Sequence, residues 1–317
     1  MERAVEFKSQ DAICRGVLRT PDGIAGPVPM MIMAGGWCYT KEIVMPHYAD
    51  YFLDSGIGVL LFDYRCFGES GGEPRQHINP WHQIEDYKNA ISFAETLDEA
   101  DHDRIGIWGI SYSGGHVLVT AATDPRAKWA ISTIPVVDGF QTLRRCHGET
   151  RFRELLELIA ADRKRRFETG AGGNIPMSST DPTKEMSCWP YPHVCQIFND
   201  IKASEAPRHE HHSTIESVEL LLDYLVPPFC TRIVDTPVMM TVAKGDNITS
   251  ADLEIGTFNA IANPSKVIDI VDGVSHMSLY SNRHHLARVG SAQAAWLTGI
   301  LFADAGEEIA PAVAASG

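Results

Sequence analysis

The chain has 317 residues, of which 44% are hydrophobic and 21% charged, a balance that is typical of globular proteins and excludes a largely disordered chain. Its net charge of -14 repels nucleic-acid phosphates and anionic lipids, which argues against partners of either kind. There is no apolar signal region at the start and no apolar run long enough to cross a bilayer, and the seven cysteines are scattered without a Cys-x-x-Cys pair. We therefore expect a cytoplasmic protein with reduced thiols.

Up to residue 139 the predicted elements alternate between strand and helix. Two short β patterns at 3–9 and 12–19 flank a polar turn and predict an antiparallel pair. Strand patterns follow at 27–36, 57–65, 104–109 and 127–134, and helical patterns begin at Pro46 and cover 82–97 and 111–123. This alternation is typical of an α/β fold with a doubly wound, mostly parallel sheet.

The alternation stops at about residue 140 and resumes with strand patterns at 237–243 and 265–273 and a last helix over roughly 285–302. The segment between, residues 140–231, contains two amphipathic helical patterns, at 151–167 and 216–225. We expect it to be a helical cap inserted after the sixth strand of a core formed by 1–139 and 232–303. The last residues, 304–317, are small and polar and are expected to be a disordered tail.

The segment GIWGISYSGG, residues 106–115, carries a candidate nucleophile at a strand-to-helix turn. A nucleophile elbow has the motif Gly-x-Ser-x-Gly, because the residues two before and two after the serine lie against neighbouring backbones and must be small. Gly109-x-Ser111-x-Ser113 meets this size rule, but so does Ser111-x-Ser113-x-Gly115. Because the strand ends at Gly109, Ser111 lies at the tip of the turn. We predict Ser111 as the nucleophile, with Ser113 as the alternative.

A serine nucleophile needs a base and an acid, which in this arrangement follow it in the order Ser, Asp or Glu, His, each after a strand. Asp246, in KGDNITS, follows the strand at 237–243. Asp138 is a rival acid after the preceding strand, and Asp246 itself also suits an ordinary turn. We predict Asp246 as the acid.

His276, in VSHMSLY, follows the strand at 265–273 and is the predicted base. The alternatives are His284 and His285, near the start of the last helix, and a surface-loop role for His276 itself. Ser111, Asp246 and His276 together satisfy both the chain order and the placement after strands.

An oxyanion hole needs backbone donors, the first being the amide that follows the nucleophile, Tyr112. The loop AGGWCYTKE after the third strand is expected to supply the second, since Gly35 and Gly36 let the backbone approach a ligand and Trp37 carries the next amide. The alternative is a plain Gly-Gly turn. If the loop supplies the oxyanion donor, Cys38 is expected to line the pocket as a wall.

Several segments in order resemble the α/β-hydrolase superfamily, in particular its dienelactone-hydrolase-like and Xaa-Pro-peptidase-like branch. They are residues 62–91, the elbow segment 104–126, AKGDNITS at 243–250 and SHMSLY at 275–280. That branch includes bacterial acyl hydrolases and fungal polyketide transferases and thiohydrolases. The resemblance implies an α/β-hydrolase fold with Ser111 as nucleophile, Asp246 as acid, His276 as base and oxyanion donors at Trp37 and Tyr112.

A triad of this kind forms an acyl-enzyme that water resolves, and it requires no metal or organic cofactor. The predicted function is a serine hydrolase that cleaves an ester, thioester or activated carbon-carbon bond of a medium-sized, apolar or aromatic small molecule. Two alternatives stay open: an acyltransferase that passes the acyl group to an alcohol or amine, and a non-catalytic ligand-binding protein. A homodimer is compatible with the sequence, which does not determine the oligomeric state.

Aromatic residues of the predicted cap suggest how a substrate is held. Most of them are expected to pack the cap onto the core, while a minority would line the mouth of an apolar pocket. We predict substrate contacts from Gly36 and Cys38 of the loop and from Trp189 and Phe229 of the cap.

Two polar stretches of the same segment have simpler interpretations. RHEHHS, residues 208–213, lacks carboxylate or thiolate ligands at zinc spacing and is interpreted as a solvated loop. The basic run 163–166 is interpreted as the wet face of a helix. The alternative is that one of its residues, or Arg144 or Arg145, meets a substrate carboxylate.

Overall fold

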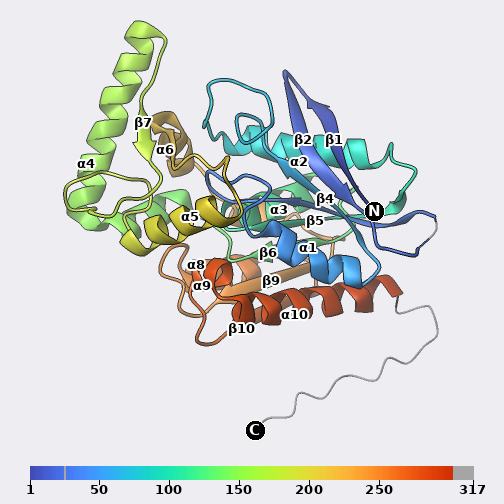
Figure 1. Cartoon of the computed structure of the whole chain (residues 1–317). Helices are drawn as coiled ribbons and strands as arrows, with labels where there is room; N and C mark the ends of the chain where they lie inside the picture. Colours follow the sequence, from blue (N-terminus) through green and yellow to red (C-terminus); the bar gives the residue numbers. More distant parts are fainter. Residues whose placement is uncertain (25, 303–317) are drawn as a thin grey trace.

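The computed structural model describes residues 1–24 and 26–302, and its centre is an eight-stranded, mostly parallel sheet (Figure 1). The strand order is β1-β2-β4-β3-β5-β6-β9-β10, with only the β1-β2 and β2-β4 pairs antiparallel. This confirms the predicted fold class. The predicted tail at 304–317 lies outside the described residues. The strands are β1 (Glu2–Ser9), β2 (Ala12–Arg19), β3 (Val28–Ala34), β4 (Gly58–Asp63), β5 (Ala100–Ile110), β6 (Ala130–Thr133), β9 (Val238–Ala243) and β10 (Lys266–Val271).

Burial along the strands follows their place in the sheet. Every residue of β3, β4 and β9 is buried, as expected for apolar runs covered by helices on both faces. β2 alternates between buried and exposed residues, because one of its faces meets solvent. These patterns are the ones that made the strands recognisable in the sequence.

Helices cover both faces of the sheet. α1 (Met45–Asp54) and α10 (Arg283–Phe302) pack side by side on one face (Figure 1). α2 (Pro80–Ala94), α3 (Tyr112–Thr123) and α8 (Ala251–Ala260) cover the other. α2 begins two residues before the predicted start, because the Asn79 side chain accepts hydrogen bonds from two amides of the first turn and Pro80 occupies the first helical position. No helix among the described residues is both long and apolar enough to span a membrane.

The segment between β6 and β9, called the insertion below, gathers beside one end of the sheet, with α4 projecting furthest (Figure 1). It contains α4 (Gly139–Thr169), α5 (Pro192–Ser204), α6 (Ile215–Leu222) and α7 (Pro227–Cys230), together with a small antiparallel pair, β7 (Asn174–Pro176) and β8 (His212–Thr214). The predicted helix at 151–167 is the second half of α4, which bends at Gly148, where φ is 65°. α5 and the β7-β8 pair were not predicted, so the insertion is not wholly helical.

The stretch 208–213 is not a solvated loop. The side chain of His209 is fully buried, and His212 begins β8. All six residues of this stretch are polar, and nothing in the local sequence indicates which other residues cover it. The burial of His209 and the strand β8 could therefore not be predicted.

Candidate active site

Ser111 occupies a sharp turn between β5 and α3. Its φ is 58° and its ψ is -118°, a conformation that costs energy for a residue other than glycine and is the one expected of an elbow nucleophile. A Cβ atom on Gly109 would lie 2.3 Å from the carbonyl oxygen of Ser113, so only glycine fits two residues before the serine. The amides of Gly114 and Val136 donate to the Ser111 carbonyl, which fixes the turn.

Ser113 has a different environment. It is completely buried, and its hydroxyl is hydrogen-bonded to the Tyr64 hydroxyl at 2.5 Å and to the carbonyl of Gly35. The side chain that replaces the second elbow glycine therefore ties the elbow to the loop after β3. Since both neighbours of its hydroxyl are protein groups, Ser113 is not presented to a ligand.

The Ser111 hydroxyl joins a chain of buried hydrogen bonds. Its Oγ lies 3.2 Å from Nε2 of His276, and Nδ1 of His276 lies 2.7 Å from Oδ2 of Asp246. Asp246 follows β9, and His276 lies between β10 and the short helix α9 (Ser278–Ser281). The other Asp246 oxygen accepts the amides of Ile248 and Thr249, each at 2.8 Å. Burial alone would raise the pKa of Asp246, but His276 and these hydrogen bonds hold it below its ordinary value, so Asp246 is ionised.

The rival residues lie elsewhere. Asp138 caps α4, where its carboxylate accepts the amide of Gln141 at 2.9 Å. His284 and His285 are in the first turn of α10, and their amides donate to the side chain of Asn282. The structure thus brings together Ser111, Asp246 and His276 and none of the alternatives.

The predicted oxyanion donors, the amides of Trp37 and Tyr112, lie close to Ser111. A Cβ atom on Gly36 would lie 3.0 Å from Cβ of Ser111, so the loop backbone passes close to the Ser111 side chain. The described residues give the amides of Trp37 and Tyr112 no hydrogen-bond acceptor, which leaves both donors free. Their rings pack edge to face, with centroids 5.2 Å apart.

Lys41 holds the far end of this loop. Its amide donates to Oδ1 of Asp63 at 2.6 Å, and its ammonium lies 2.9 Å from Oδ2 of Asp63 and 2.6 Å from Glu69. The Asp63 carboxylate is completely buried, so it depends on Lys41 for its charge partner.

We expect Lys41→Met to lower the free energy of unfolding by about 3–5 kcal/mol, because the substitution leaves Asp63 buried without a cation. Urea unfolding followed by circular dichroism measures the change. Lys88→Met is the control: Lys88 pairs with Glu85 near the surface, and its loss should cost less than about 1 kcal/mol. Equal stabilities of the two variants would contradict the role assigned to Lys41.

The cavity at Ser111 and His276 has a volume of about 20 Å³, room for about one water molecule. The insertion closes it, since Trp189 and three of its other side chains form part of the wall. Phe229, also predicted to contact substrate, does not line this cavity: its ring packs 5.8 Å from that of Trp81, with the Arg232 guanidinium over it. The cavity is lined by Trp37, Tyr39, Ser111, Met177, Trp189, Val194, Phe198, Ile248, His276 and Met277.

Cys38 is likewise not a wall of the cavity. Its thiol donates to the carbonyl of His212 at 3.3 Å, and its own carbonyl accepts from Nδ1 of His209 at 3.0 Å. Burial raises the pKa of the Cys38 thiol, so it stays protonated. Cys38 therefore joins the loop after β3 to the insertion.

From Cys38, a chain of hydrogen bonds with defined donors and acceptors continues into the insertion. Because the Cys38 carbonyl can only accept, Nδ1 of His209 carries a proton and its Nε2 accepts from Nδ1 of His211 at 3.2 Å. The Ser178 hydroxyl then donates to Nε2 of His211 at 2.7 Å. Both imidazoles are neutral in this arrangement. Burial, with a further effect from His211, lowers the pKa of His209 to about 4.

The joint should weaken in acid. Between about pH 6.5 and 4, His209 binds a proton in the unfolded chain but not in the folded chain. The free energy of unfolding therefore falls as the pH falls through this range. His209→Asn keeps a donor for the Cys38 carbonyl but cannot titrate. We expect the Tm difference between pH 7.5 and pH 5 to be smaller in this variant than in the wild type. An unchanged difference would assign the acid sensitivity to other groups.

The basic residues considered for a substrate carboxylate are paired with acidic side chains of the protein. Arg145 lies 2.7 Å from Asp252, and Arg166 lies 2.8 Å from Glu216. Arg166 also pairs with Asp162 and Glu219, and the other pairs are Arg144 with Glu149, Arg163 with Glu219, Lys164 with Glu168 and Arg165 with Asp162. These contacts favour the interpretation of residues 163–166 as a helix surface.

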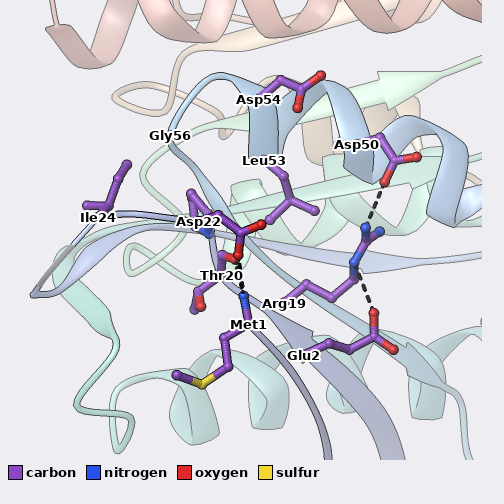
Figure 2. A pocket seen from close by; sticks show the side chains of 11 residues that line it. Met1, Glu2, Arg19, Thr20, Asp22, Ile24, Asp50, Leu53, Asp54 and Gly56 are labelled. Carbon is purple, nitrogen blue, oxygen red and sulfur yellow. Dashed lines mark hydrogen bonds and ion pairs between the residues drawn. The ribbon is translucent and has the colours of Figure 1, made fainter.

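A much larger cavity, about 710 Å³, lies beside the start of β1 and the end of α1 (Figure 2). Arg19 pairs with two carboxylates that line the same cavity, lying 3.3 Å from Glu2 and 2.8 Å from Asp50. No serine, cysteine or histidine is among the described residues that line it. Its size therefore does not make it the reactive site.

Sequence reasoning missed two tyrosines at the site. The ring of Tyr280 stacks on His276, with centroids 5.7 Å apart and planes at 27°, and Tyr39 packs between Tyr280 and Phe198. Both tyrosines belong to segments that were singled out, SHMSLY and AGGWCYTKE. Their proximity depends on the fold, so no local pattern indicates it.

The chain is similar to a known family and to several known proteins. The family described as X-Pro dipeptidyl-peptidase (S15 family) matches residues 17–169. Polyketide transferase af380 of Aspergillus fumigatus is 31% identical over 87% of this chain and 90% of its own. Quorum-quenching protein AidA of Acinetobacter baumannii is 43% identical, but the match spans only 44% of this chain and 45% of that protein.

A solved structure extends the comparison to the fold. The α/β hydrolase GrgF from Penicillium sp. sh18 superimposes with a TM-score of 0.78 over 94% of this chain and 98% of its own, at 23% identity. The relatives above place the activity at the level of hydrolysis or acyl transfer, and the solved structure shows the fold. The chain therefore belongs to the α/β-hydrolase superfamily.

Proposed function

We propose that Ser111, His276 and Asp246 form a catalytic triad and that the protein is a serine hydrolase. Its substrate would be an ester, thioester or activated carbon-carbon bond of a medium-sized, apolar or aromatic small molecule. One observation carries the proposal: the buried chain of hydrogen bonds from Ser111 to His276 at 3.2 Å and on to Asp246 at 2.7 Å.

The mechanism follows from the positions of these groups. Nε2 of His276 removes the hydroxyl proton as Ser111 Oγ attacks the acyl carbon, and the ionised Asp246 stabilises the resulting imidazolium. The amides of Trp37 and Tyr112 would hold the oxyanion. His276 then gives its proton to the leaving group, and an ester remains on Ser111. Water, deprotonated by the same imidazole, releases the acid.

We further propose that residues 140–231 of the insertion form a cap that moves when substrate binds. Small-molecule sites are commonly about 300–1,000 Å³, whereas about 20 Å³ is open at Ser111. The contacts that hold the insertion to the core include partly exposed ion pairs, such as Glu205 with Arg283 at 3.3 Å and Arg208 with Glu69 at 2.8 Å. Such pairs are individually weak, so these two contacts add little to the cost of displacing the cap.

The cavity lining supports an apolar acyl group. Met177, Trp189, Val194 and Phe198 of the insertion present hydrocarbon and aromatic surface, and none carries a charge. The arginines of the insertion that were considered for a substrate carboxylate pair with carboxylates of the protein. An uncharged acyl chain is therefore the expected occupant.

Trp189→Ala tests this lining. We expect kcat/KM for a p-nitrophenyl ester of a medium-length acid to fall about tenfold, because the acyl chain loses buried apolar contact. Phe229→Ala removes an aromatic ring from the same insertion, away from the cavity, and should change kcat/KM less than twofold. Equal losses in the two variants would indicate a general effect on the cap and contradict a contact from Trp189.

The second candidate function is acyl transfer, because a relative over most of the chain is named a polyketide transferase. Both reactions share the acyl-enzyme and differ in what resolves it. A single acyl thioester incubated with and without an alcohol or an amine separates them. Free acid at an unchanged rate supports hydrolysis, whereas acylated acceptor formed at the expense of acid supports transfer. A third possibility, ligand binding alone, predicts no covalent labelling by a fluorophosphonate.

A further inference from the structure

A second carboxyl group lies behind Asp246, and the mechanism above does not use it. Glu254, on α8, is completely buried, and among the described residues it makes no ion pair. Its Oε2 has no hydrogen-bond partner in this part of the chain. An unpaired carboxyl in such a place costs stability, so its presence beside the site needs an explanation.

Thr249 connects Glu254 to the proposed triad. Its hydroxyl is hydrogen-bonded to Oε1 of Glu254, and the Thr249 hydroxyl oxygen lies 3.4 Å from Nδ1 of His276. The Thr249 amide donates to Asp246 at 2.8 Å. One residue therefore contacts both His276 and Asp246, and a single hydrogen bond to Glu254 determines where its hydroxyl points.

The surroundings of Glu254 favour the neutral acid. Burial, followed by the negative charge of Asp246, raises the pKa of Glu254 well above its ordinary value. The other charge acting on it is Asp252, which is exposed and paired with Arg145. His276 lies on the far side of Thr249. No cation among the described residues offsets an ionised carboxylate here.

We propose that Glu254 is a positioning residue for the His276–Asp246 pair. As a neutral acid it accepts the Thr249 proton at Oε1, which turns the Thr249 oxygen toward the proton on Nδ1 of His276. That proton then has a main acceptor in Asp246 at 2.7 Å and a second, longer one in Thr249. The second acceptor restrains the imidazole as it becomes charged. This inference rests on the proposed triad.

The readout is the second-order rate constant for labelling by a fluorophosphonate probe between pH 5 and 9, which needs no knowledge of the substrate. We expect Glu254→Leu and Thr249→Val each to lower it about three- to tenfold, the size of one lost hydrogen bond. Because both remove the same arrangement, the double variant should be no slower than either single one. Glu254→Gln keeps an acceptor and no charge, and should label within twofold of wild type with the same pH profile.

Thermal unfolding separates positioning from structure. Glu254→Leu removes an unsatisfied buried oxygen but also the acceptor of the Thr249 hydroxyl. The double variant removes both partners, so its Tm should not fall although its labelling slows. Thr257→Val is the matched control: this buried hydroxyl lies one turn further along α8 and donates only to the Leu253 carbonyl, so labelling should be unchanged.

Three outcomes overturn the inference. Wild-type labelling in Glu254→Leu would remove the positioning role, and additive losses in the double variant would remove the link through Thr249. A lower apparent pKa in the pH profile of labelling for Glu254→Gln than for wild type would mean that the substitution had removed a negative charge near His276. Glu254 would then not be neutral. No labelling of the wild type is a different failure, since it refutes the triad itself.

Discussion

Ser111→Ala is expected to lower kcat for hydrolysis of a p-nitrophenyl ester by at least about 10⁴-fold, because no other group at the site can take over the attack on the acyl carbon. The substitution removes only an oxygen atom from a turn whose geometry depends on backbone hydrogen bonds and on Gly109. The Tm should therefore change little. Steady-state kinetics with a circular-dichroism melt measure both quantities.

Ser113→Ala is the matched control. It removes a hydroxyl two residues away that is bonded to Tyr64 and to the Gly35 carbonyl. We expect a loss of stability of about 1–3 kcal/mol, and a fall in kcat of about tenfold or less as the loop that carries Trp37 loosens. The reverse pattern, with activity lost only in Ser113→Ala, would contradict the assignment of Ser111.

Asp246→Asn is expected to lower kcat about 10⁴-fold while the protein stays folded. The asparagine oxygen can still accept the amides of Ile248 and Thr249, but its NH₂ group would face Nδ1 of His276. The imidazole would then hold its proton on Nε2 and could not accept one from Ser111. Kinetics with the same ester measure the loss.

The lowered pKa of Asp246 determines how its stabilising effect depends on pH. The pKa of Asp246 is below its ordinary value, so the carboxylate is charged throughout the neutral range and its stabilising effect is lost only in acid, as the pH falls through the folded-state pKa. Around neutral pH, Asp246→Asn should therefore lower the rate by the same factor at every pH, because Asp246 does not change its protonation state in this range. Asp138→Asn is the control, since asparagine also caps helices; equal losses in the two variants would contradict the role of Asp246.

The core of the fold could be predicted because its signals are local. β3 and β4 are continuous apolar runs, α1 has Pro46 in its first turn, α2 carries a stripe of apolar residues at helical spacing, and the elbow is a contiguous motif. The chain order of Ser111, Asp246 and His276 after strands predicted their proximity, since the carboxyl ends of parallel strands share one edge of a sheet. Their catalytic role stays a prediction that the experiments above test.

The insertion resisted prediction because long-range contacts determine its structure. α5 was not predicted, and β7 and β8 are three residues each and pair across about 40 residues of chain. Cys38 and Phe229 show the same limit: each residue type suits a pocket wall, yet one side chain faces His212 and the other Trp81. The buried Glu254 also follows no local rule, since a carboxylate on a helix usually faces water.

Peptide mapping of the wild-type protein after reaction with a fluorophosphonate tests the proposed triad most directly. We expect one phosphonylated residue, Ser111, and loss of the modification when His276 is replaced by alanine. Modification at Ser113, modification that does not depend on His276, or no modification at all would contradict the proposed triad.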